Sequence, residues 1–190
     1  TSVIQELEGL KSSYLGNSQL YWSQRPMPFI ARSLWTPKLG IVAPTNEIER
    51  KDRTYNGSIF SDVSIDQQIG RWGWGWNPRV QKNLHRFSTG AARSANTSHL
   101  FSHNVSGNYS PGIFSFALTA GQTITWTYAS VVNQQYFIEE SASVQLNSSV
   151  FLSLGHSNGG NVFKTDGQTS NVNLFNARSS TVFALLSCQL

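Results

Sequence analysis

Segments in which apolar and polar residues alternate recur through much of this 190-residue chain. In the clearest of them, residues 123–128, Ile124, Trp126 and Tyr128 alternate with threonines. A period of two places the apolar side chains on one face of a β-strand, whereas an amphipathic helix needs a period near 3.6. The chain is therefore predicted to be all-β, with antiparallel strands.

The spacing of these segments indicates a β-sandwich, a jelly roll or a closed barrel, of which the sandwich or jelly roll is the predicted fold. About eight short strands, one every ~8–12 residues, are typical of such folds. The predicted strands are 59–69, 113–119, 122–128, 136–138, 144–146, 150–154, 162–164, 172–175 and 181–186. Ala120-Gly121 predicts a hairpin turn. Charged residues make up only 13% of the chain, which favours exposed strand faces of Ser, Thr and Asn over a helical bundle.

Two domains of unequal size are predicted. Residues 1–20 resemble a helix or the end of a coiled-coil stalk, since Val3, Leu7 and Leu10 fall on one helical face. Residues 21–190 form the predicted β head. It begins with a proline-rich collar over 21–45, because prolines disfavour both helices and central strands.

The most unusual segment is a cluster of alternating tryptophans and glycines. On an extended backbone, Trp72, Trp74 and Trp76 project from one face, with Arg71 and Asn77 at the two ends of the run. These five residues are the candidate ligand-binding site, since aromatic rings can stack on sugar rings or hold a cation. The alternative is that the indoles form core or a subunit interface.

Charge and cysteine content restrict the partners. The net charge is +4, but acidic residues interrupt the basic first half and no nucleic-acid-binding module is present, so nucleic acid is an improbable partner. The single cysteine, Cys188, excludes an internal disulfide. No stretch contains the ~18 apolar residues of a membrane-spanning helix, so no membrane span is predicted.

Catalytic and metal sites find no support in the sequence. Glu139 and Glu140 would point to opposite faces of a strand, and Asp62 and Asp66 would lie ~13 Å apart along one. The chain has four histidines: His85, His99, His103 and His156. The closest pair in sequence, His99 and His103, lies in a loop-like, polar context. The chain is predicted not to be an enzyme and to use no metal or other cofactor.

The order of segments resembles the tip of a trimeric fibre: a phage or viral receptor-binding head, or a bacterial adhesive fibre tip. That resemblance covers layout only, from the stalk-like residues 1–20 to the apolar run 181–190, and carries over no functional residue. It implies a tumour-necrosis-factor/C1q-like jelly roll, a homotrimer, a cell-surface glycan or protein as receptor, and an extracellular or virion-surface location. A viral capsid or decoration subunit is the alternative function, and a polysaccharide-acting enzyme is a weaker one.

Overall fold

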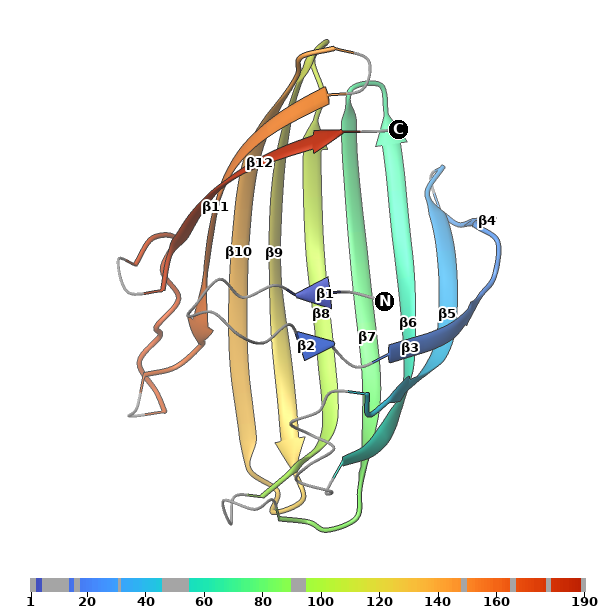
Figure 1. Cartoon of the computed structure of the whole chain (residues 1–190), viewed down its shortest axis with the longest axis vertical. Coiled ribbons are helices and arrows are strands. Elements are labelled where there is room, and N and C mark those ends of the chain that lie inside the picture. Colours follow the sequence, from blue (N-terminus) through green and yellow to red (C-terminus); the bar gives the residue numbers. More distant parts are fainter. Residues whose placement is uncertain are drawn as a thin grey trace.

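One large antiparallel sheet dominates the structure, a computed structural model that describes residues 3–4, 14–15, 18–30, 32–45, 55–89, 95–147, 150–164, 167–176 and 179–188. Its ten strands run in the order β12-β11-β10-β9-β8-β7-β6-β5-β3, with β4 beside β5 (Figure 1). A separate two-stranded pair is β1 (Val3–Ile4) and β2 (Tyr14–Leu15). The all-β, antiparallel prediction is confirmed.

The strands follow one another as a simple meander, each beside its predecessor from β5 to β12. Those at the start are β3 (Ser18–Ser23), β4 (Met27–Pro28) and β5 (Leu34–Ala43). The long central strands are β6 (Tyr55–Ile69), β7 (Trp72–His85), β8 (Thr97–Tyr109), β9 (Phe114–Thr127) and β10 (Val132–Gln145). The last two are β11 (Val150–Asn161) and β12 (Thr181–Cys188).

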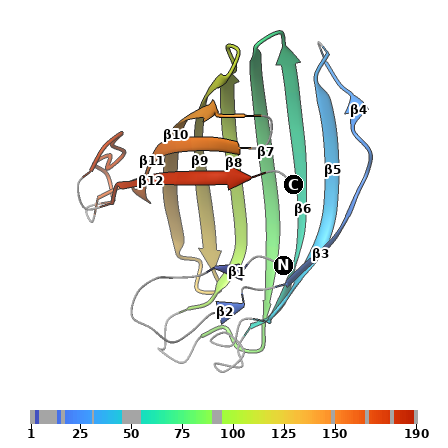
Figure 2. The same cartoon turned by 45° about the horizontal axis from the view of Figure 1, so that its top comes forward.

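The sheet is strongly curved. Figures 1 and 2 show its two ends, β3 and β12, curling toward the same side of the central strands. The β6–β7, β8–β9 and β10–β11 turns are short and lie at the upper end in Figure 1. The longer β7–β8 connection lies at the lower end, and the β11–β12 connection lies at the left, near mid-height. The predicted two-layer sandwich differs from this arrangement, because successive long strands pair with each other instead of crossing to a second sheet.

Strand lengths were underestimated from sequence. Residues 113–128 were predicted as two strands, but β9 runs straight through Ala120 and Gly121. Gly121 serves close packing here, since a Cβ at this position would lie 2.7 Å from Phe137 Cζ and 2.6 Å from the His103 carbonyl oxygen. A small residue is thus required within the strand, where the sequence pattern indicated a turn.

Two predicted strands late in the chain are not strands in the structure. Residues 162–164 and 172–175 belong to the β11–β12 connection. Backbone carbonyls of this connection bond to side chains of the sheet: Tyr136 Oη donates to the Asn171 carbonyl at 3.3 Å, and Asn158 Nδ2 donates to the Asn173 carbonyl. These side-chain bonds satisfy the backbone without a strand partner.

The predicted helix is not seen in the described part of residues 1–20. Those residues form β1, β2 and the start of β3, and the remainder, residues 1–2, 5–13 and 16–17, lies outside the described part. The collar residues 21–45 form strands too: β3 and β4 lie at the edge of the sheet, and β5 lies between them and β6. β3 pairs with β5 as far as Lys38, and β4 pairs with β5 from Trp35 onward. Pro37 lies between these two paired stretches, so β5 accommodates a residue that has no backbone N–H.

Candidate functional site: the two faces of the sheet

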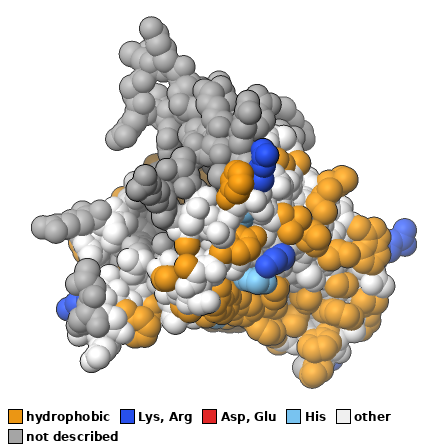
Figure 3. Space-filling model, turned by 90° about the horizontal axis from the view of Figure 1, so that it is seen from below, with side chains coloured by type: hydrophobic (Ala, Val, Ile, Leu, Met, Phe, Trp, Pro, Cys, Tyr) orange, Lys and Arg blue, Asp and Glu red, His pale blue; other side chains and the backbone are white. Residues whose placement is uncertain are grey.

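One face of the sheet is apolar and exposed. Cross-strand partners share a face, so the registers trace it from strand to strand. One such row joins Trp35 to Ile65, Trp76, Val105 and Ala120. Side chains on this face are strongly exposed, including Trp72 at 64% and Val80 at 56%. Figure 3 shows hydrophobic side chains gathered over much of one side of the molecule.

All six tryptophans of the chain lie on this apolar face. They come from four different strands: Trp22 from β3, Trp35 from β5, Trp72, Trp74 and Trp76 from β7, and Trp126 from β9. By contrast, the only buried hydrophobic side chains in the described part are Val42, Phe60 and Tyr136. The tryptophans therefore do not form a conventional core among the described residues.

The predicted ligand site is split between two faces. Trp72, Trp74 and Trp76 share the apolar face, as the period of two predicts, and Trp72 stacks on Tyr109 with 4.3 Å between ring centroids. Asn77 lies on the opposite face, where its Nδ2 donates to Asn104 Oδ1 at 3.1 Å. Arg71 lies in the β6–β7 turn. The five residues do not converge on one pocket.

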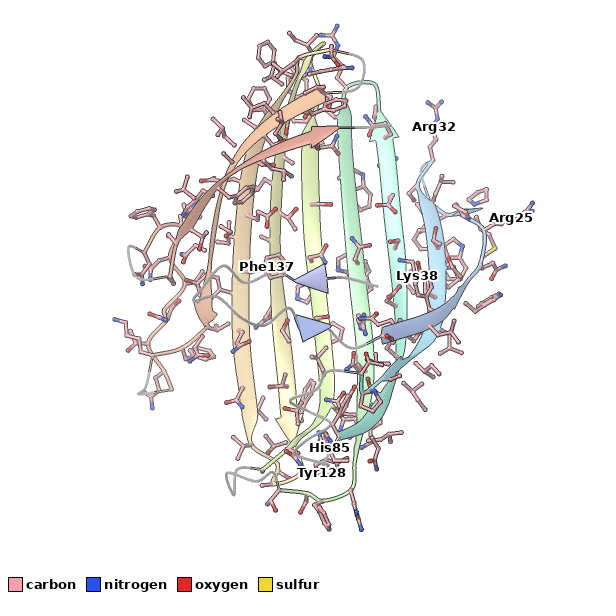
Figure 4. The ribbon with its side chains drawn as sticks, in the orientation of Figure 1. Arg25, Arg32, Lys38, His85, Tyr128 and Phe137 are labelled. Atoms are coloured by element: carbon pink, nitrogen blue, oxygen red, sulfur yellow. The ribbon has the colours of Figure 1, made fainter. Side chains whose placement is uncertain are left out.

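The opposite face is polar and concave. Side chains crowd together there: a Cβ on Gly75 would lie 2.8 Å from Asp66 Oδ1 and 2.9 Å from Ser106 Oγ. On the apolar face, a Cβ on Gly107 would meet nothing within 4 Å. Side chains converge on the inside of a curve and diverge on its outside, so the apolar face is the convex one. Figure 4 labels Lys38 and Phe137, which belong to the concave face.

Hydrogen bonds connect the polar side chains of the concave face. Arg79 Nη2 donates to Gln81 Oε1 at 2.7 Å, and Gln81 Nε2 donates to Asn83 Oδ1 at 2.7 Å. The Arg79 guanidinium also lies 3.9 Å from the centre of the Phe60 ring. Burial lowers the pKa of Arg79 from its ordinary value, and the nearby Asp62 carboxylate opposes that shift. The guanidinium stays cationic even so.

The carboxylates and histidines form no catalytic constellation in the described part of the chain. Asp62 pairs with Lys38 at 3.6 Å. Glu139 and Glu140 occupy opposite faces, and Glu140 Oε1 lies 3.1 Å from His156 Nδ1. His99 and His103 lie in β8 on the convex face, not in the loop that the sequence indicated. No group of three potential metal ligands is found among the described residues.

From β7 to β11, the first polar side chains of the convex face lie along an oblique line. On each strand, the side chains of this face are counted from the end with the short turns. The first polar side chain comes latest on β7, earlier on β8 and β9, and earliest on β10 and β11. In that order, it is Lys82, His103, Gln122, Glu140 and His156. On β6, Gln67 already lies opposite Trp74, and on β8 and β9 apolar side chains return beyond the line at Phe101 and Ile124. The registers place His103 and Gln122 level with Pro78, and Glu140 and His156 level with Trp74. Sequence reasoning missed this boundary because it depends on the register of five strands.

The apolar stretch on β7 has a definite length. From Trp72 to Val80 it spans eight residue steps, or ~27 Å at the usual rise of an antiparallel strand.

The described part of the chain contains no helix long and apolar enough to cross a membrane. No protein family, curated protein or solved structure matches the chain. The two faces must therefore be interpreted from their own geometry.

Proposed function

We propose that this chain is a membrane-embedded sheet, whose convex face contacts lipid acyl chains and whose concave face contacts water. The oblique apolar boundary carries the proposal. Strands in a bilayer are tilted by about 35–45°, so a planar lipid layer meets neighbouring strands at different residues and its edge crosses the registers obliquely. With that tilt, the ~27 Å apolar stretch on β7 would cover ~19–22 Å along the bilayer normal, most of the ~25 Å height of the lipid-facing band of membrane strands.

The curvature supports lipid over a second protein layer. A convex surface can touch another convex surface only along a narrow strip, so a second copy facing it would leave most of the apolar side chains in water. A fluid acyl-chain layer fits any curvature. Exposed apolar patches on water-soluble monomers rarely exceed a few hundred Å². This proposal departs from the sequence-based prediction of no membrane span, which considered helices alone.

A matched pair of neighbouring residues tests the proposal. Ala120 is exposed on the convex face between Val105 and Ile138, and Thr119 precedes it on the concave face. We expect Ala120→Arg to lower the free energy of unfolding in phospholipid vesicles by ~2–4 kcal/mol, because the guanidinium would enter the acyl-chain layer. Thr119→Arg faces water, beside Glu139, and should change it by less than ~1 kcal/mol.

The measurement is a urea titration in vesicles, followed by tryptophan fluorescence. A water-exposed alanine tolerates arginine within about 0.5 kcal/mol, so equal stabilities of the two variants would contradict the proposal. Failure of the wild type to float with vesicles in a density gradient would contradict it as well.

Surface recognition is a second proposal, favoured by the unequal connections. The chain runs through long connections from β7 to β8 and from β11 to β12. By contrast, a two-residue turn at residues 70–71 joins β6 to β7 at the opposite strand ends. In membrane-embedded sheets the longer loops face the outside of the cell. A glycan or protein receptor would then meet these loops, and a glycan array probed with the protein in micelles tests this.

A further inference from the structure

A hollow of about 750 Å³ opens on the convex face at the polar end of β7. It is formed by β7, β8, β9 and the start of the β9–β10 turn. Lys82, His99 and Trp126 belong to one cross-strand row across it. Tyr128 completes the wall near the lower end in Figure 4, where its ring packs edge-on against His85 at 5.8 Å.

Lys82 places one positive charge in the hollow, beside His99. Lys82 Nζ lies 3.0 Å from His99 Nε2 and 5.5 Å from the centre of the Tyr128 ring. Among the described residues, neither Lys82 nor His99 forms an ion pair with a carboxylate. Because an ammonium group only donates, His99 Nε2 accepts from Lys82, and His99 Nδ1 lies 3.0 Å from Ser98 Oγ. The other two N–H groups of Lys82 can donate to an anionic oxygen cluster, such as a phosphate.

The remainder of the hollow is apolar. Val80 and Phe101 are cross-strand partners on the side toward the short turns, and the Trp126 indole lies beside them in the next row. On the convex face of β7, Lys82 is also the first polar side chain after the apolar stretch that begins at Trp72. A ligand that fits must therefore carry its negative charge at one end and hydrocarbon at the other.

We infer that this hollow binds the phosphate headgroup of an anionic phospholipid, with the Lys82 ammonium, oriented by its bond to His99, on the phosphate and the acyl chains along Val80 and Phe101. The inference rests on the proposed membrane function and names the ligand that its convex face would select. Lysine and aromatic residues at the edge of an acyl-chain layer are suited to headgroup depth, since each combines an apolar body with a polar tip.

Lipid selectivity in vesicles and micelles tests the site. The probe is phosphatidylglycerol, compared with zwitterionic phosphatidylcholine, and bound lipid is counted by native mass spectrometry after release from micelles. We expect Lys82→Gln to weaken retention of phosphatidylglycerol about fivefold or more, whereas Lys82→Arg, which keeps the positive charge, should retain this lipid as the wild type does. Arg25→Gln, which removes an exposed positive charge between β3 and β4, away from the hollow, is the control and should leave retention unchanged.

The outcomes separate this site from the membrane proposal. If the protein inserts into vesicles but retains both lipids equally, the headgroup site is wrong and the membrane proposal stands. Equal retention by wild type and Lys82→Gln also overturns the site. Displacement of phosphatidylglycerol by millimolar inorganic phosphate would identify a free-phosphate site instead and overturn the lipid assignment. If the protein does not insert into vesicles, both proposals fail together.

Discussion

At the scale of single residues, glycines on the two faces of the sheet have different structural roles. Gly121 lies on the concave face, where a Cβ would meet Phe137 and the backbone of His103. Gly107 lies on the convex face, where a Cβ would meet nothing within 4 Å. Both are in the interior of long strands, so backbone effects are similar and the surrounding side chains decide what a substitution costs.

This difference predicts opposite outcomes for two alanine substitutions. Gly121→Ala should lower the free energy of unfolding by ~1–3 kcal/mol, because neighbouring atoms must shift to admit the methyl group. Gly107→Ala should be neutral or stabilising by up to ~1 kcal/mol, since alanine loses less backbone freedom on folding. Urea titration of both variants under the same conditions is the measurement. A larger loss from Gly107→Ala would show that the concave and convex faces have been exchanged.

At the scale of elements, the sequence predicted strand character well and strand length poorly. Alternation over 59–69 and 122–128 correctly indicated strands, because the period of two reflects two different environments. Ala120-Gly121 misled because a glycine required for close packing has the same composition as a glycine required for a turn. Packing against Phe137 depends on the register with β10, which local sequence does not contain.

The candidate site shows the same division. The shared face of Trp72, Trp74 and Trp76 follows from spacing alone and could be predicted. Their exposure could not, because tryptophans alternating with glycines are equally compatible with core and with surface. The Lys82 and His99 pair could not be predicted either, since the two residues are 17 positions apart and meet only through the β7–β8 register.

A single-residue insertion tests the continuity of β9. A serine inserted between Ala120 and Gly121 would move every residue on one side of it to the opposite face, placing threonines on the apolar side and Ile124 on the polar side. We expect this variant to lose the folded state. The same insertion between Pro111 and Gly112, in the β8–β9 connection, should preserve it. Circular dichroism and protease resistance measure the folded fraction, and tolerance of the first insertion would restore the turn predicted from sequence.

At the scale of the whole molecule, a lipid environment constrains the edges of the sheet as well as its faces. β3 and β12 end the strand order, and backbone groups at an edge need partners inside a bilayer. Further strands, from a second copy or from another partner, would supply them. The homotrimer expected from sequence remains a proposal, and edge pairing gives it a physical basis different from a coiled-coil stalk.

The depth of individual tryptophans provides a test of the orientation. Trp76 lies midway along the apolar stretch of β7, between Trp72 and Val80, whereas Trp126 lies in the row of Lys82, at the polar end. In variants that keep one tryptophan and carry phenylalanine at the other five positions, lipids brominated near the end of the acyl chain should quench Trp76 most strongly. Lipids brominated close to the headgroup should quench Trp72 and Trp126 more than Trp76, because aromatic residues at the two borders lie at headgroup depth. Equal quenching of all three at every bromine depth would mean that the sheet does not cross the acyl-chain layer, and no quenching at all would mean that protein covers the convex face.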